Sequence, residues 1–161
     1  MSTFQIREAR LPVDKPAILQ FIFALQVHEH SFELNRRIDA QVAEEHYAVL
    51  IPHVAEHNGQ VLIAEDEAGH IIGWAAFYED GGDVFIHAEE RRHGFLAELY
   101  VVETARGAGV GRALIAACED WARGRGLTSL RIGLLARNAD ALKVYERSGY
   151  APYTLQVRKY L

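Results

Sequence analysis

The chain has 161 residues, half of them hydrophobic and 24% charged, which fits one globular domain, residues 1–161, with a hydrophobic core of its own. The formal net charge of −5 argues against nucleic acid as a partner, because domains that neutralise phosphates usually carry an excess of basic residues. A single cysteine, Cys118, excludes an internal disulfide, and neither a signal-peptide pattern nor an apolar stretch of membrane-spanning length is present, so we expect a cytoplasmic protein with no membrane partner.

The first part of the chain shows one strand pattern followed by two helical patterns. Apolar residues alternate in the strand pattern and recur at helical spacing in the other two. Pro12 or Asp14 lies near the start of the first helix, and Pro52 is expected to break or kink the second. The predicted elements are a strand at 4–9, a helix at 12–27, a polar irregular segment at 28–37 and a helix at 39–57.

Strand patterns dominate the middle of the chain, and strands alternate with helices towards its end. The stretch 83–94 has the least certain pattern, and Gly126 suits a helix C-terminus. The predicted elements are a hairpin of strands at 60–65 and 71–78, a strand at 95–102, a helix at 107–125, a strand at 129–135, a helix at 138–147 and a last strand at 153–160. This order predicts an α/β (α+β) fold with a mixed sheet.

A glycine-rich turn between the strand at 95–102 and the next helix is the most informative segment. It reads Arg106-Gly107-Ala108-Gly109-Val110-Gly111-Arg112. The first turn of a helix has free backbone N–H groups and a favourable dipole for anions, and glycines let a phosphate approach the backbone. The two arginines can add charge-assisted hydrogen bonds. The segment therefore predicts a pyrophosphate site, with a ligand-free glycine turn as the alternative.

Two other phosphate-binding motifs do not fit this turn. A nucleotide-binding P-loop requires Gly-Lys-Ser or Gly-Lys-Thr at its end, where this chain has Gly111-Arg112-Ala113. A dinucleotide-binding turn requires a third glycine further along the helix and an acidic residue on the next strand, where Arg131 stands.

Two motifs resemble the cofactor segments of the GCN5-related N-acetyltransferase (GNAT) superfamily. The first is Arg106-x-x-Gly109-x-Gly111 after the strand residues Leu99-Tyr100-Val101, and the second is Asn138-x-x-Ala141-x-x-x-Tyr145-x-x-x-Gly149-Tyr150. The likeness covers essentially the whole chain and is closest to diamine and small-molecule acetyltransferases. It implies a GNAT-like, mixed but mostly antiparallel central sheet flanked by helices, with a splayed strand pair at the acetyl-CoA site.

The resemblance also implies how acetyl-CoA binds as acyl donor, without a metal. Backbone groups of Leu99, Tyr100 and Val101 would pair with the pantetheine arm as with an added strand. Asn138, near Ala141, would contact the pantetheine or the thioester, and Tyr145 would lie near the sulfur. The pyrophosphate would be held by the backbone amides of Gly107, Ala108, Gly109, Val110, Gly111 and Arg112, next to Arg106. A homodimer through the strand at 153–160 is a further implication.

Tyr145 and Glu98 are the candidate acid and base. Tyr145 falls on the same helical face as Asn138, and a phenol can donate a proton to a departing sulfur, although it could simply be an aromatic core residue. Glu98 interrupts an apolar strand, where alternation predicts that it faces opposite to its neighbours. It could take a proton through water or attract a cationic amine, and the alternative is a carboxylate satisfied by Arg131 on the adjacent strand.

The acceptor pocket is less well defined by the sequence. Glu29 and Glu33 follow the first helical pattern and could contact an amine, and His93 could be a proton relay or a surface residue. The spacing of His28, His30 and Glu33 suggests a metal site but has no fixed ligand geometry, so a solvated loop without metal is favoured.

The sequence therefore predicts an acetyl-CoA-dependent N-acetyltransferase that moves an acetyl group to a primary amine of a small molecule by direct attack on the thioester. One alternative is an acetyltransferase for protein lysines or N-termini. Another is a non-catalytic acyl-CoA-binding module, which the presence of Tyr145 and Glu98 disfavours. An acetyltransferase for charged transfer RNA is disfavoured by the acidic balance.

Overall fold

A computed structural model describes residues 3–161, whose strands form one sheet in the order β1-β2-β3-β4-β5. The first three strand pairs are antiparallel and β4 pairs with β5 in parallel, which confirms the mixed, mostly antiparallel sheet. The elements are β1 (Phe4–Glu8), α1 (Lys15–His30), α2 (Val42–Glu56), β2 (Gln60–Asp66), β3 (Ile71–Asp80), α3 (Ala88–Arg91), β4 (His93–Val101), a 3-10 helix (Glu103–Ala105), α4 (Val110–Gly124), β5 (Leu130–Ile132) and α5 (Ala139–Arg147).

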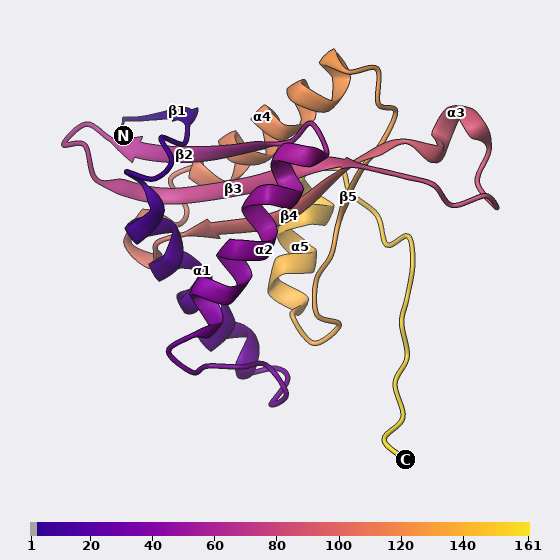
Figure 1. The fold of residues 1–161 in the computed structure, drawn as a ribbon, viewed down its shortest axis with the longest axis horizontal. Coiled ribbons are helices and arrows are strands. Elements are labelled where there is room, and N and C mark those ends of the chain that lie inside the picture. Colours follow the sequence, from indigo (N-terminus) through magenta and orange to yellow (C-terminus); the bar gives the residue numbers. More distant parts are fainter. Residues whose placement is uncertain (1–2) are drawn as a thin grey trace.

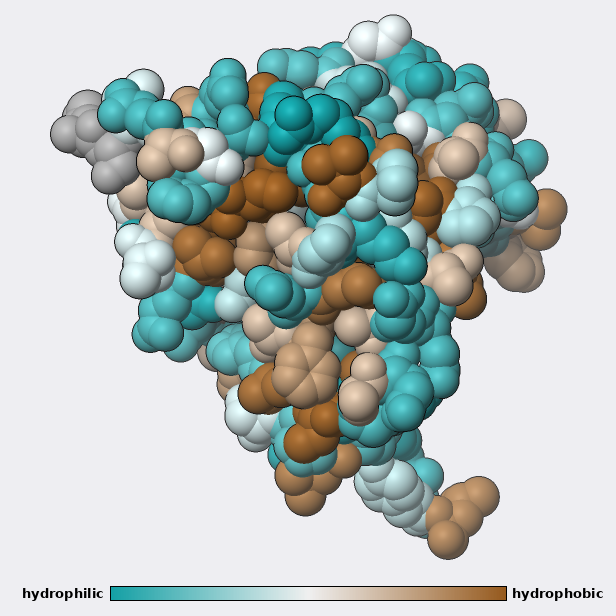
Figure 2. All heavy atoms as spheres, turned by 60° about the vertical axis from the view of Figure 1, so that its left-hand side comes forward, coloured by the Kyte–Doolittle hydropathy of each residue, from teal (hydrophilic) through white to brown (hydrophobic). Residues whose placement is uncertain are grey.

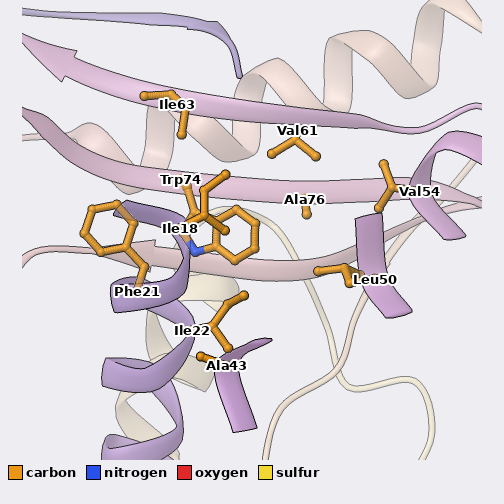
Figure 3. Packing of buried hydrophobic residues seen from close by; sticks show 10 residues of the cluster. All are labelled: Ile18, Phe21, Ile22, Ala43, Leu50, Val54, Val61, Ile63, Trp74 and Ala76. Carbon is orange, nitrogen blue, oxygen red and sulfur yellow. The ribbon is translucent and has the colours of Figure 1, made fainter. Parts of the chain in front are cut away.

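Helices cover both faces of this sheet, with α1 and α2 on one side and α4 on the other (Figure 1). On the α1/α2 side, Ile18 and Ile22 lie one turn apart and insert between the helices and β3, where Trp74 is fully buried (Figure 3). Removing such side chains from water drives the layers together, at roughly 1.5–3 kcal/mol for each large apolar side chain. None of the helices in residues 3–161 combines the length and apolar character needed to cross a membrane.

The α4 side of the sheet is packed by a stripe on one helix face. Val110, Leu114 and Cys118 are spaced by four residues and are almost fully buried against Phe77 and Leu96 of the sheet. Spacing by four residues keeps side chains on the same face of a helix. This packing fixes the start of α4 next to the end of β4.

Strand β4 contains a bulge at Ala97. Glu98 pairs with Ala76 and Leu96 pairs with Phe77, so Ala97 has no partner across the strand. Ala97 packs on the α1/α2 side, the side to which Glu98 also turns. The prediction that Glu98 faces opposite to Ala97 is therefore wrong, because a bulge interrupts the alternation of side chains. Leu99 does lie on the other face, as expected.

Several element boundaries differ from the sequence-based ones. Helix α1 begins later and runs on to His30, so His28 lies in a helix and not in an irregular segment. Helix α2 continues through Pro52, where a break or kink was expected. Strand β5 ends at Ile132, three residues before the predicted end, because β5 leaves β4 there. The glycine turn delays the start of α4 to Val110.

The predicted strand at 153–160 is absent. Residues 151–161 have no regular secondary structure and are exposed, and Figure 1 shows this segment extending away from the sheet. Tyr153, Leu155 and Val157 alternate as in a strand, but a strand pattern needs a paired sheet edge to form its backbone hydrogen bonds. The segment is held instead by its side chains: Tyr153 lies under the Arg131 guanidinium, and Arg158 pairs with Glu33.

Candidate active site

Strands β4 and β5 separate beyond a short paired region. Their parallel pairing covers only residues 94–96 of β4 and 130–132 of β5. Within the described chain, residues 98–101 of β4 therefore face no strand on the β5 side, and an extended ligand could pair with that edge. This is the splayed pair that the sequence resemblance implied at Leu99, Tyr100 and Val101.

Arg106 lies across the end of this open edge. Its Nε donates a hydrogen bond to the carbonyl oxygen of Val101 at 3.1 Å, and its guanidinium lies 5.7 Å from the ring centroid of Tyr100. A ligand that needs the Val101 carbonyl must compete with Arg106 for it. The arginine is thus placed between the β4 edge and the glycine turn.

The glycine turn forms an open backbone cradle at the start of α4. Gly107 and Gly109 have φ angles of +78° and +90°, a conformation that other residues adopt only with strain. A Cβ atom at either position would meet nothing within 4 Å, so the space above the turn is open. Gly109 is the N-cap, no side chain of residues 3–161 caps this end, and Ala113 donates the first bond, to the Gly109 carbonyl. The free N–H groups before Ala113 suit an anion.

Asn138 has a structural role at the start of α5. Its Oδ1 accepts a hydrogen bond from the backbone N–H of Ala141 at 3.1 Å and so caps the helix. Only the side-chain NH₂ group is then left to contact a ligand. The capping hydrogen bond explains the three-residue spacing of Asn138 and Ala141 without any cofactor, although the two uses are compatible.

Tyr145 lies on α5 and packs against the apolar cluster on the α4 side, with its ring edge towards Tyr150. Burial raises the pKa of the Tyr145 phenol, and the negative charge of Glu98 raises this pKa further. Tyr145 is therefore protonated at neutral pH and able to donate its proton. Its packing against the apolar cluster fits a structural role as a core residue, and its position near Glu98 fits a role as the catalytic proton donor.

Glu98 is paired with a histidine and not with Arg131, so the sequence-based alternative for Glu98 is wrong. Its Oε1 lies 2.7 Å from Nε2 of His46 on α2, while Arg131 stacks on Tyr153. The other oxygen, Oε2, is buried and has no hydrogen-bond partner among residues 3–161. The hydrogen bond to Glu98 raises the pKa of His46, against a smaller opposing effect of burial.

Sequence analysis did not identify His46 as a site residue. In the sequence, His46 shares one side of the helical pattern at 39–57 with Val42, Val49 and Leu50. A polar side chain on an otherwise apolar helix face needs a partner, and that mismatch was the available signal. The partner itself lies 52 residues away and could not be named from local spacing.

The remaining candidates divide between the site and its surroundings. Glu29 pairs with Arg36 at 3.3 Å, and burial raises its pKa, with a further contribution from the charge of Glu98. Glu33 is bound by Arg158, whose hydrogen bond lowers the pKa of Glu33, so this carboxylate is already occupied. His93 is buried at the opposite end of β4, five residues or about 17 Å from Glu98. Of these three candidates, Glu29 alone lies near Glu98, whose charge contributes to its raised pKa.

Metal ligands and a cysteine nucleophile find no support in this arrangement. Within residues 3–161, no group of three or more His, Cys, Asp or Glu side chains is placed to hold a metal ion. His30 bonds the Arg36 carbonyl at 2.7 Å instead of joining Glu33. Cys118 is buried, and burial raises the pKa of its thiol to about 12, so it is not a nucleophile at neutral pH.

This fold and site define an acyltransferase enzyme. A family model described as the acetyltransferase (GNAT) family matches residues 20–150, and the chain belongs to this family. Acetyl-CoA is the cosubstrate of the family. The cradle at Gly107 and Gly109 and the open β4 edge are features that such a donor fits.

Relatives and solved structures agree with this assignment. The chain is 34% identical over 112 residues to YhfO of Bacillus subtilis, an uncharacterized N-acetyltransferase, covering 70% of each chain. It is 37% identical over 93 residues to an aminoglycoside N(6')-acetyltransferase type 1 of Klebsiella aerogenes, covering 56% of this chain and 58% of the relative. A GCN5-related N-acetyltransferase from Ralstonia eutropha superimposes with a TM-score of 0.76 at 18% identity, covering 98% of this chain and 99% of that one.

Proposed function

We propose that residues 1–161 act as one N-acetyltransferase domain that moves an acetyl group from acetyl-CoA to a primary amine of a small molecule. The observation that carries this proposal is the buried, unpartnered Oε2 atom of Glu98 beside the open edge of β4. A buried carboxylate oxygen without a donor is costly, and an amine N–H group would satisfy it.

The donor would lie along the open edge of β4 and end at the glycine turn. Backbone groups from Leu99 to Val101 would pair with the pantetheine arm, and the free N–H groups at the start of α4 would hold the pyrophosphate. Beyond the turn, a hollow of about 310 Å³ between α4 and α5 is flanked by Arg112 and Arg147, which suit a further phosphate of the nucleotide end.

The protein would supply two proton transfers at the reacting centre. Acetyl-CoA provides a thioester that an amine attacks directly, with loss of the CoA thiol. Glu98 would take the proton from the attacking nitrogen through Oε2, because Oε1 is engaged by His46. Tyr145 would donate its phenolic proton towards the leaving sulfur, since its raised pKa keeps it protonated.

A small acceptor is favoured over a protein or peptide amine by the way the loop at 31–41 is fastened. Arg137, which follows β5, donates to the carbonyl oxygen of Phe32, and Arg158 of the C-terminal segment pairs with Glu33. These contacts join segments from opposite ends of the chain next to the end of α1. They support a closed pocket and leave less room for an extended groove.

Calorimetric titration of the purified chain tests the donor assignment. We expect acetyl-CoA and free CoA to bind and NADH not to bind, because the NADH motif is missing from the glycine turn. Binding must then be followed by thiol release that depends on an added amine. Failure of acetyl-CoA to bind would overturn the proposed function.

We also propose that the chain forms a homodimer through its C-terminal segment. Tyr153, Leu155 and Val157 are at least 65% exposed. Figure 2 shows hydrophobic residues at the surface of the lower part of the molecule, where Figure 1 places both the end of α1 and the C-terminal segment. In the described chain β5 pairs only with β4, so its other edge is open to a strand from a second copy. Light scattering should give twice the chain mass, and one chain mass for Leu155→Glu. Leu34→Glu, at an exposed leucine elsewhere, is the control, and a monomeric wild-type chain would contradict the proposal.

A further inference from the structure

The pair formed by His46 and Glu98 is asymmetric in its exposure to water. The side chain of Glu98 is only 10% exposed, whereas that of His46 is 38% exposed. A proton delivered to the buried Glu98 carboxylate has no direct route to solvent. The carboxylate is, however, one hydrogen bond away from His46, whose side chain reaches solvent. His46 therefore connects the buried carboxylate with the surface.

The two oxygens of Glu98 also have different surroundings. Oε1 lies 2.7 Å from Nε2 of His46, within hydrogen-bond distance, and Oε2 is buried without a partner in the part of the chain that the structure describes. An N–H donor on one oxygen restricts rotation of the carboxylate and keeps the other oxygen directed elsewhere. Nε2 of His46 donates this bond when the ring is protonated or carries its single proton on Nε2, and it can accept a proton from Glu98 only in the neutral form that has its proton on Nδ1.

Charged and titratable groups reach this pair from two neighbouring elements, α1 and α5. Glu29 comes from α1 and raises the pKa of His46 in addition to the effect of Glu98. Tyr145 comes from α5 and senses the charge of Glu98. Opposite them, β3 contributes the apolar Ala76. The groups that act on Glu29 in turn, and so indirectly on the pair, are Arg36 and His28.

We propose that His46 is a positioning residue that orients Glu98 through Oε1 and passes the proton of the acceptor amine from Glu98 to solvent. This inference rests on the proposed function. In the step, the amine nitrogen bonds to the thioester carbon and the carbon–sulfur bond breaks. The nitrogen's proton moves to Oε2 of Glu98, while the departing sulfur receives the proton of Tyr145. The protonated Glu98 carboxyl then turns to present this proton to Nε2 of a neutral His46 ring whose own proton is on Nδ1. The ring releases its Nδ1 proton to water and regains the starting tautomer by exchange with water, and Tyr145 is reprotonated from solvent.

The pH dependence of turnover follows from this arrangement. A protonated His46 cannot accept a further proton, so the relay works only after the ring has lost its proton. Because Glu98 raises the pKa of His46 above its ordinary value of 6.5, turnover should increase with pH through a midpoint above 6.5. A residue that only stabilises the fold would not create this acid limb.

The test compares kcat against pH for the wild type, His46→Gln and His46→Ala, with saturating acetyl-CoA and amine. Glutamine places an N–H donor near the position of Nε2 but does not titrate, so His46→Gln should lose the acid limb and keep more activity than His46→Ala. His46→Ala should lower kcat about a hundredfold, the low end of what one proton-transfer group contributes. Titration of the amine itself is common to all variants and cancels in the comparison. His53→Gln on the same helix is the control and should match the wild type.

A second readout does not depend on turnover. The pKa of the His46 ring, followed by NMR, should lie above 6.5 in the wild type and fall in Glu98→Gln. An unchanged His46 pKa in Glu98→Gln, an acid limb retained in His46→Gln, or wild-type kcat in His46→Ala would each overturn the inference while leaving the proposed function standing. Absence of amine-dependent thiol release by the wild type would overturn both.

Discussion

Glu98 on β4 and His46 on α2 lie 52 residues apart in the sequence and are joined by a 2.7 Å contact between Oε1 and Nε2. The bulge at Ala97 turns Glu98 towards α2, and the packing of α2 on the sheet brings His46 to meet it. The chemistry proposed for this protein depends on that meeting, because it leaves Oε2 of Glu98 free at the end of the paired part of β4 and β5.

Replacing Tyr145 by phenylalanine should remove the proton donor and little else. We expect Tyr145→Phe to lower kcat by about a hundredfold or more and to leave acetyl-CoA affinity within about threefold of wild type. Tyr153→Phe, at an exposed tyrosine, is the control. Because the Tyr145 pKa is raised above 10, the wild-type rate should not fall through its ionisation below pH 10. Unchanged kcat in Tyr145→Phe would assign this residue to the core alone.

A side chain at Gly109 should interfere with the phosphate cradle. Gly109 and Gly69 both have positive φ and open space where a Cβ would stand, but Gly69 lies in the turn between β2 and β3. Both alanine variants should lose about 1–2 kcal/mol of stability from backbone strain. Only Gly109→Ala should weaken the binding of acetyl-CoA. We expect its Kd to rise by about tenfold or more, which is the equivalent of losing one hydrogen bond to a charged group. Equal affinities of the two variants in calorimetry would argue against a phosphate at this turn.

The ion pair between Arg7 and Asp14 should be important for stability. Asp14 is 2% exposed and accepts two hydrogen bonds from Arg7, at 2.8 and 3.1 Å. Arg7→Ala should cost about 3 kcal/mol in urea unfolding, the low end for breaking a buried ion pair, because the buried carboxylate keeps only the backbone N–H and the 3.7 Å ion pair of Arg10. Arg37→Ala, which breaks only exposed ion pairs, should cost less than about 1 kcal/mol. Similar costs for the two variants would contradict this account of Asp14.

The same pair predicts a pH effect on stability. The hydrogen bond from Arg7 lowers the pKa of Asp14 below 3.8, its ordinary value. A lowered carboxylate pKa adds stability that is fully present above pH 3.8 and is lost as the pH falls through the lower folded value. The stability difference between wild type and Arg7→Ala should therefore shrink below pH 3.8. A difference that stays constant down to pH 2 would count against the pair.

Cys118 should be chemically inert in the folded protein. It lies on the buried face of α4 against the sheet, and its thiol pKa is raised to about 12. Iodoacetamide at pH 8 should therefore label unfolded but not native protein, and treatment of the native enzyme should leave acetyl transfer unchanged. Native labelling at the rate of an exposed cysteine would show that the α4 packing is looser than described.

Local sequence patterns predicted the parts of the fold and site that local chemistry determines. The strand patterns of β2 and β3, the helix that carries Val110, Leu114 and Cys118, and the glycine turn all follow from residues within one element. Gly109 has the positive φ that its residue type suggests. The glycine turn and its open backbone could therefore be located from the sequence alone.

Features that depend on a distant partner were missed or wrong. The bulge at Ala97 arises from the register between β3 and β4, and the residue types in β4 do not predict it. The pairing of Glu98 with His46 requires the tertiary packing of α2. The strand pattern around Leu155 has no paired edge within this one chain, so the predicted strand does not form. In each case the behaviour of the residue depends on a neighbour that is distant in the sequence and is brought close only by the fold.

The most direct test of the central claim is thiol release from acetyl-CoA by the purified protein in the presence of a panel of small primary amines, with mass spectrometry of the products. The account predicts amine-dependent release of CoA, an N-acetylated product in equal amount, and loss of both in Tyr145→Phe. Acetyl-CoA binding without any amine-dependent release would contradict it, and would make the chain an acyl-CoA-binding module that does not catalyse transfer.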